Sequence, residues 1–327
     1  MEGPNEYLND HFSEVLDALK QKDLRPEVYF HSSEEMRELA DESVQLVVTS
    51  PPYPMIEMWD KLFEKLLSLR GPFSEDPKAF DHAHEFLGKV WSECHRVLEA
   101  GGIMCVNIGD ATRTVANNFR YYMNHVRIVE ICESLGFQSL VPILWRKPTN
   151  KPNAFLGSGF YPPNAYVTLD CEFILIFRKG SKRVVIPRDP LRYASQYSKR
   201  ERDTWFSQIW DIRGASQNHE DTAPFPDELP YRLIRMFSCL GDKVLDPFLG
   251  TGRTVRIARA LGRKGIGYEF NSNLRPLIED NVVFRSANAQ EILDSILTLY
   301  EASEDPSATI ASPRVTNPQD STLVAFR

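Results

Sequence analysis

The fold is decided by the stretch Lys243-Val244-Leu245-Asp246-Pro247-Phe248-Leu249-Gly250-Thr251-Gly252, in which an apolar strand runs directly into a glycine turn. A helical segment follows, and the next strand, 265–268, ends at Glu269. Glycines let a backbone pass close to a ligand, and a helix N-terminus offers unbonded N–H groups. An acid at the end of the next strand can hold a ribose hydroxyl pair. The stretch indicates a nucleoside-cofactor site, although dinucleotide sites and ligand-free turns share such a turn.

A second motif lies at the end of an earlier strand. Residues 44–48 form a β-branched run typical of a buried parallel strand, which continues into Thr49-Ser50-Pro51-Pro52-Tyr53. The two prolines end strand pairing because neither donates a backbone hydrogen bond, and the motif could serve as nothing more than this break. Ligands bind beyond the carboxyl ends of strands at the switch point of an open sheet, so neighbouring strands would place both motifs in one cleft.

Strands alternate with helices along the chain. Helices are expected over 7–20, 33–40, 57–69, 78–98, 120–135, 227–239 and 274–300, and after the glycine turn. Further strands are expected over 27–31, 103–108, 138–145 and 172–177. This alternation predicts an α/β fold, a doubly wound and mostly parallel Rossmann-like sheet with helices on both faces.

The composition is that of an ordinary globular protein of 327 residues. The acidic N-terminus lacks the apolar core of a secretory signal, and no apolar run is long enough to span a membrane, so a cytoplasmic protein is expected. The five cysteines are scattered without a Cys-x-x-Cys pair, which argues against a disulfide framework and a zinc site. No metal is expected.

The charge is unevenly distributed, although the whole chain carries −7. Between Trp145 and Arg213 there are thirteen basic and six acidic residues. Such a segment is typical of a localised phosphate-contacting surface, and the alternative is a solvated charged face. The residues expected to contact nucleic acid are Lys182, Arg183, Arg188, Arg192, Lys199, Arg200 and Arg202.

These motifs, in this order, resemble those of the amino-methylating DNA methyltransferases, and most closely the cytosine-N4 group of the permuted (beta) class. In that family a Ser/Asp-Pro-Pro-Tyr motif holds the target amino group, and an Asp-Pro-Phe-x-Gly-x-Gly motif binds S-adenosylmethionine. The beta class places the catalytic motif first and the recognition region between the two, as Ser50, the basic segment and Asp246 are ordered here. The resemblance runs from about Val28 to Asn281.

The resemblance implies S-adenosyl-L-methionine as cofactor and assigns residues to both motifs. The implied catalytic residues are Ser50, Pro51, Pro52 and Tyr53. The implied cofactor-binding residues are Ser32, Phe225, Pro226, Asp246, Pro247, Phe248, Gly250, Gly252 and Glu269. Three positions depart from the family pattern: His219 is separated from Ala223-Pro224-Phe225-Pro226, Arg253 replaces a small hydroxyl residue, and Ser32 replaces a common Asp.

The resemblance also implies partners and an organisation of the chain. We expect a site-specific enzyme acting on double-stranded DNA in a bacterial or archaeal nucleoid, as a monomer or homodimer, alongside a cognate restriction endonuclease. The expected parts are an N-terminal helical extension (1–26), a catalytic part (27–179), a small inserted target-recognition region (180–218), a cofactor-binding part (219–300) and a disordered tail (301–327).

The chemistry expected of the first motif is positioning. The Ser50 hydroxyl and the Pro51 carbonyl can accept hydrogen bonds from a target amino group, and Tyr53 can stack on a flipped-out base or simply pack. Serine at this position favours cytosine N4 over adenine N6 within the family. No cysteine follows a proline, which excludes the cysteine chemistry of the cytosine-C5 enzymes. Adenine-N6 methylation, a catalytically silent DNA-binding subunit and an NAD-dependent enzyme remain alternatives.

Overall fold

The computed structural model describes residues 4–115, 118–147, 156–157, 162–163, 165–167, 169–214, 225–282, 284, 288–304, 314–315 and 323–324. Within these residues the main sheet has nine strands in the order β1-β13-β12-β2-β3-β10-β7-β11, with β6 paired to β10. The strands are β1 (Glu27–Tyr29), β2 (Val44–Thr49), β3 (Leu98–Ile108), β6 (Phe137–Ser139), β7 (Ile143–Arg146), β10 (Cys171–Lys179), β11 (Ile209–Asp211), β12 (Lys243–Asp246) and β13 (Lys264–Tyr268).

The two strands that carry the motifs are neighbours. β12 pairs in parallel with β2, with Leu245 opposite Val47. β10 is antiparallel to β3, β6 and β7, while the other described pairings of the sheet are parallel. The carboxyl ends of β2 and β12 therefore meet at one edge, as predicted.

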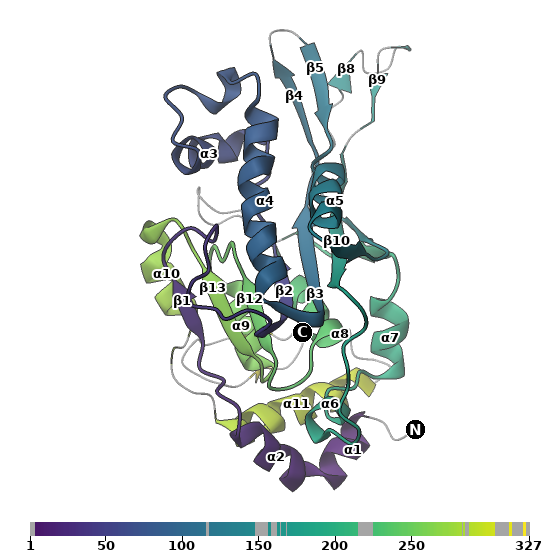
Figure 1. Cartoon of the computed structure of the whole chain (residues 1–327). Helices are drawn as coiled ribbons and strands as arrows, with labels where there is room; N and C mark the ends of the chain where they lie inside the picture. The colour runs from purple at the N-terminus through teal and green to yellow at the C-terminus, as the bar shows by residue number, and fades with distance from the viewer. Residues whose placement is uncertain are drawn as a thin grey trace.

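Helices cover both faces of the sheet (Figure 1). The helices are α1 (Pro4–Asp10), α2 (Phe12–Lys20), α3 (Asp60–Leu66), α4 (Ala79–Val97), α5 (Asn124–Ser134), α6 (Pro190–Tyr193), α7 (Lys199–Trp205), α8 (Glu228–Phe237), α9 (Arg253–Ala260), α10 (Arg275–Asn281) and α11 (Ala289–Glu304), with single 3₁₀ turns η1 (Glu57–Trp59), η2 (Phe73–Glu75) and η3 (Ser272–Leu274). Helices α4 and α5 contact β3 and β10, whereas α8 and α9 contact β2, β12 and β13.

The alternation of side chains along the central strands produces two cores. Val47 and Met104 belong to the core beneath α4, and Leu46, Val48 and Cys105 belong to the core on the opposite face. Because successive strand residues point to opposite faces, an apolar residue at every position requires both faces to be covered. The predicted doubly wound architecture is confirmed.

A third apolar cluster lies beyond the amino ends of the strands, where α1, α2, α6 and α11 pack together (Figure 1). The predicted helix over 7–20 is two helices here, divided at His11. The predicted helix over 274–300 is likewise divided into α10 and α11. No helix in the described part of the chain is long and apolar enough to cross a membrane.

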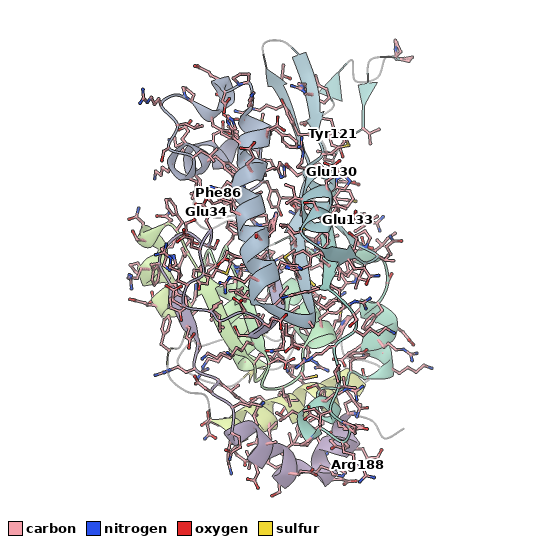
Figure 2. The ribbon with its side chains drawn as sticks, viewed as in Figure 1. Glu34, Phe86, Tyr121, Glu130, Glu133 and Arg188 are labelled. Atoms are coloured by element: carbon pink, nitrogen blue, oxygen red, sulfur yellow. The ribbon has the colours of Figure 1, made fainter. Side chains whose placement is uncertain are left out.

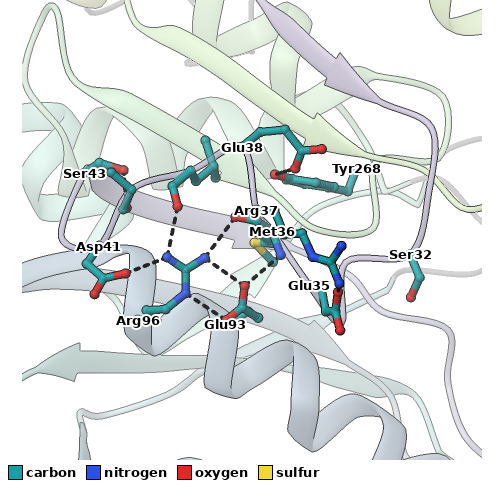
Figure 3. A network of polar contacts seen from close by, with 12 residues as sticks. Ser32, Glu35, Met36, Arg37, Glu38, Asp41, Ser43, Glu93, Arg96 and Tyr268 are labelled. Atoms are coloured by element: carbon teal, nitrogen blue, oxygen red, sulfur yellow. Dashed lines mark hydrogen bonds and ion pairs between the residues drawn. The ribbon is translucent and has the colours of Figure 1, made fainter.

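The predicted helix over 33–40 is wrong, because the segment is a series of turns. Arg96 on α4 donates to the carbonyl oxygens of Met36 (2.9 Å) and Leu39 (2.9 Å), and Glu93 accepts from the Met36 amide at 2.7 Å (Figure 3). Backbone groups bonded to side chains of another helix do not need the i to i−4 pattern. The helical spacing in this segment therefore does not reflect a helix.

Two further predicted elements, the helix over 120–135 and the strand over 138–145, have different bounds in the structure. Strands β4 (Ala111–Val115) and β5 (Asn118–Tyr122) form a hairpin, so the helix predicted from 120 begins at Asn124. Thr, Phe and Tyr alternating with polar residues favour strands there. The strand predicted over 138–145 divides into β6 and β7 around Pro142, which lacks a backbone N–H donor.

The segments that we assigned as a recognition region and a tail contain regular structure. Region 180–218 contributes α6, α7 and β11, and β11 joins the main sheet beside β7. Of the expected tail, 301–304 continue α11, and β14 (Arg314–Val315) pairs with β15 (Leu323–Val324). Strand β8 (Leu156–Gly157) pairs with β9 (Ala165–Tyr166). His219, Ala223 and Pro224 lie outside the described residues.

The contacts of Arg96 with Met36, Leu39 and Glu93, here called the Arg96 clamp, generate a stability prediction. Arg96→Ala should lower the free energy of unfolding by about 2–4 kcal/mol, because two carbonyl groups and Glu93 lose their donor. Urea denaturation measures the change. Arg37→Ala, in the same segment but on an exposed side chain, should stay within about 0.5 kcal/mol of wild type. Equal losses in both variants would contradict the clamp.

Candidate active site

One buried carboxylate joins the two motifs. Asp246 accepts hydrogen bonds from Thr49 Oγ1 (2.6 Å), Thr254 Oγ1 (2.7 Å) and the Phe248 amide (3.1 Å). Burial raises the pKa of Asp246 to about 6, against the effect of these donors. The last residue of β2 and the glycine loop are therefore held to each other through a single side chain.

A cavity of about 770 Å³ opens at the carboxyl ends of these strands. Ser50, Pro52 and Tyr53 line it from the predicted catalytic motif. The predicted cofactor residues that line it are Ser32, Phe225, Pro247, Phe248, Gly250 and Glu269. The described lining does not include Pro51, Pro226, Asp246 or Gly252. The structure thus brings most of both predicted sets into one space, and Asp246 acts there as a support.

Asn124, at the start of α5, links the end of the Ser-Pro-Pro-Tyr loop to the residue that follows β3. Its side-chain amide donates to the carbonyl oxygens of Pro54 (3.1 Å) and Gly109 (2.9 Å), and its oxygen lies 3.0 Å from His84 Nε2. Burial lowers the pKa of His84 to about 4, so the imidazole is neutral and donates to the amide oxygen. These buried hydrogen bonds fix the loop to the end of β3.

The Tyr53 hydroxyl is bonded to Ser50 and to two residues that the sequence did not single out, Asn107 and Glu172. The hydroxyl donates to Glu172 Oε2 (2.9 Å), accepts from Asn107 Nδ2 (2.7 Å) and lies 3.1 Å from Ser50 Oγ. Burial, reinforced by the charge of Glu172, raises the pKa of Tyr53 far above its usual value. Tyr53 therefore stays protonated and acts as a donor, with its ring held in one orientation.

Lys147 completes this polar cluster. Its ammonium forms an ion pair with Glu172 Oε1 and lies 4.4 Å from the centre of the Trp145 ring. Asn107, Trp145, Lys147 and Glu172 all line the cavity. They come from β3, β10 and the end of β7, without a shared local motif. Their polar character at the ends of apolar strands was the one available signal.

The glycine loop and Glu269 form the other half of the cavity. Glu269 accepts from the amides of Gly250 (2.8 Å) and Asn271 (2.7 Å), and burial raises its pKa to about 7. Gly250 has a φ of 55° and Gly252 a φ of 86°, a left-handed conformation that favours glycine. A side chain at Gly250 would meet nothing within 4 Å, so the backbone there borders open space.

Arg253 departs from the family pattern for a local reason. Its guanidinium donates to the carbonyl oxygen of Phe225 (2.9 Å) and lies 3.4 Å from Asp227. Arg253 also lines the cavity, as Phe225 does. Arg253 thus connects the segment that carries Phe225 to the start of α9.

The predicted DNA-contacting residues are not brought to the cavity. Arg183 pairs with Asp242 (2.7 Å) and Glu99 (2.6 Å), at the amino ends of β12 and β3. Arg188 lies beside α1 and α6, far from Tyr121 near the opposite end of the molecule (Figure 2). Lys182 lies just after β10, close to Gly101 of β3. The other four lie on α6 and α7: Arg192, Lys199, Arg200 and Arg202. DNA contact by these seven residues stays a prediction.

A doubly wound sheet that joins a Ser-Pro-Pro-Tyr loop to a glycine loop at one cavity defines a Rossmann-like methyltransferase. The family model of DNA methylases that covers N6 and N4 methylation matches residues 44–280, and the chain belongs to this family.

Two archaeal relatives support this assignment. Type II methyltransferase M.MjaI of Methanocaldococcus jannaschii is 55% identical over 273 residues, covering 78% of this chain and 90% of its own. Type II methyltransferase M.MthZI of Methanothermobacter thermautotrophicus is 47% identical over 272 residues, covering 78% of this chain and 76% of its own.

Solved structures agree with the fold. A putative DNA modification methylase of Thermus thermophilus, crystallised with S-adenosyl-L-methionine, has a TM-score of 0.63 and 31% identity, covering 78% of this chain and 91% of that chain. The PvuII DNA methyltransferase (cytosine-N4-specific) has a TM-score of 0.55 at 17% identity, covering 85% of this chain and 95% of that chain. The second similarity concerns the fold alone.

Gly109 provides a test of how Tyr53 is positioned. A Cβ at Gly109 would lie 3.0 Å from Tyr53 Cε2 and 3.3 Å from Glu172 Cγ, so Gly109→Ala should displace both by a few tenths of an ångström. We expect methyl-transfer turnover to fall about tenfold or more while the melting temperature changes little. Radiolabelled methyl transfer to DNA and thermal denaturation measure the two effects. Gly88→Ala, whose Cβ meets Ile131 at an ordinary 3.5 Å, should keep wild-type turnover.

Proposed function

We propose that this DNA methylase transfers a methyl group from S-adenosyl-L-methionine to the exocyclic N4 amino group of a cytosine flipped out of double-stranded DNA. The observation that carries the proposal is that Ser50 and the glycine loop line one cavity, with their strands joined through Thr49 and Asp246. Serine at position 50 supports cytosine as the target. The cofactor supplies an electrophilic methyl group on a sulfonium sulfur.

Ser50 and Pro51 are assigned to the target amino group. The lone pair of a cytosine N4 is delocalised into the ring, so acceptors aimed at its hydrogens favour a more nucleophilic, tetrahedral nitrogen. The Ser50 hydroxyl and the Pro51 carbonyl are such acceptors, and the rigid prolines fix the carbonyl direction. Serine is a weak base, so its contribution is positioning and electrostatics.

Tyr53 offers its ring to the extruded base. Flipping a base costs a few kcal/mol, and stacking on an aromatic ring returns roughly 1–3 kcal/mol. The three polar partners of the Tyr53 hydroxyl hold the ring before the base arrives. A fixed ring loses less entropy on binding than a mobile one.

The residues of the second half of the cavity fit the cofactor. The carboxylate of Glu269 is placed at the end of β13 to accept from ribose hydroxyls. Open space beside Gly250 lets a ligand approach the backbone closely. Phe225 and Phe248 add apolar surface to the same space.

The relatives named as type II methyltransferases support a role in restriction-modification. A separate endonuclease that cuts the same unmethylated sequence would be the functional partner. The duplex itself is the macromolecular substrate.

Nucleoside mass spectrometry tests the target base. DNA from cells expressing the wild-type chain should contain N4-methylcytosine, and DNA from cells expressing Ser50→Ala should contain at least about 100-fold less per unit time. The affinity of the variant for S-adenosyl-L-methionine should stay within about threefold, because the Ser50 contact is to the target. N6-methyladenine alone would move the proposal to adenine. Cofactor binding without any methyl transfer would support a silent subunit.

The pKa of Glu269 generates a pH prediction. Its value of about 7 means that the carboxylate is largely neutral below pH 7 and ionised above it. The ionised form accepts hydrogen bonds from ribose and attracts the sulfonium, so cofactor affinity should fall about tenfold between pH 8 and pH 6.

Isothermal titration calorimetry at several pH values measures this fall. Glu269→Gln should bind more weakly at pH 8 and lose most of the pH dependence that distinguishes wild type. Asp211→Asn, which removes a surface carboxylate paired with Arg146, is the matched control and should keep the wild-type profile. Parallel pH profiles of wild type and Glu269→Gln would refute the assignment.

A further inference from the structure

Lys147 places a cation inside the cavity beside the Ser-Pro-Pro-Tyr loop. Its ammonium is held by Glu172 Oε1 and by the face of Trp145, and the opposite oxygen of the same carboxylate accepts from the Tyr53 hydroxyl. The described contacts use one of its three hydrogen-bond donors. The side chain is 39% exposed and lines the cavity, so it is accessible to a ligand bound there.

The polar groups around this part of the cavity form a complementary pair. Ser50 Oγ, which lines the cavity, can act as an acceptor, while Lys147 carries donors only. The Watson–Crick edge of cytosine carries an amino donor followed by two acceptors, N3 and O2. Adenine carries an amino donor, one acceptor at N1 and then a C–H group. A cationic donor beyond the amino-binding acceptors therefore matches cytosine at one more position than adenine.

We infer that Lys147 donates hydrogen bonds to the N3 and O2 edge of the flipped cytosine and so contributes to recognition of the target base. The inference rests on the proposed function and deepens it. Glu172 serves as the positioning residue, because it orients the ammonium with one oxygen and the Tyr53 ring with the other. The same carboxylate thus sets the edge contact and the stacking surface relative to each other.

The fixed position of Glu172 makes this arrangement specific. Its side chain is 14% exposed, and Asn107 Nδ2 donates to its Oε2 at 2.7 Å. A carboxylate with two firm donors on one oxygen is restricted in rotation, so the opposite oxygen and its cation are restricted too. Lys147 therefore enters the cavity from a defined direction.

The experiment compares cytosine with an analogue that lacks N3, one of the two proposed acceptors. Duplexes carry cytosine or 3-deazacytosine at the methylated position, which is first identified by methylation-sensitive sequencing of host DNA. We expect wild type to lose about 10- to 100-fold in kcat/KM on 3-deazacytosine, the effect of one hydrogen bond to a charged group. Lys147→Met should be slower on cytosine and lose less than about threefold further on the analogue.

Two controls separate reading of the base from structural support. Arg146 is next to Lys147 in sequence, but its side chain pairs with Asp211 on the surface. Arg146→Met should therefore keep the wild-type ratio of rates on the two duplexes. Lys147→Arg, which retains a cationic donor, should keep part of it. A purely structural role would slow Lys147→Met equally on both duplexes and leave the wild-type ratio unchanged.

The outcomes also distinguish this inference from the proposed function. Cytosine methylation with equal rates on both duplexes, or with undiminished discrimination in Lys147→Met, overturns the role of Lys147 alone. Absence of cytosine methylation by wild type overturns the proposed function together with the inference.

Discussion

The hydrogen bond from Thr49 to Asp246 is the contact on which the site depends. It joins the last residue of β2 to the last residue of β12 at 2.6 Å, in the interior of the sheet. A buried carboxylate is stable only when its acceptor sites are filled, and Thr254 and the Phe248 amide fill the rest. Any change that separates β2 from β12 would remove the Thr49 donor from that buried carboxylate. The cofactor loop and the catalytic loop therefore have one defined relative position.

Support for the catalytic loop comes from the neighbouring strands. Asn124 joins the Pro54 carbonyl to the Gly109 carbonyl, and the small size of Gly109 lets the Tyr53 ring pack against the end of β3. Glu172 on β10 then fixes the hydroxyl of that ring. A loop with two prolines is stiff by itself, and these contacts determine where it points.

The parts of this structure that follow from sequence are those with local signals. Apolar runs ending in Pro-Pro or in a glycine turn specify both the strands and the motifs, and the sheet order placed them together as expected. The helix expected over 33–40 failed because Arg96, far along the chain, satisfies its backbone groups. Lys147, Asn107 and Glu172 were missed because single polar residues on three separate segments form a cluster only after folding.

The basic segment shows the limit of composition as a guide to surface. Arg183 is drawn into ion pairs with Glu99 and Asp242, so its charge holds the chain to the amino ends of the strands. A count of charges along the sequence cannot distinguish such a structural cation from one that faces a ligand. The cation that does line the cavity, Lys147, lies next to Arg146, which pairs with Asp211 on the surface.

Two buried acids, Asp246 and Glu269, connect the stability of the site to its ligand. Burial raises the pKa of Asp246 to about 6 and that of Glu269 to about 7, so ionising them in the free protein is unfavourable. A bound cation opposes this effect, because an opposite charge favours the ionised carboxylate. A positively charged cofactor therefore stabilises the same loops that bind it.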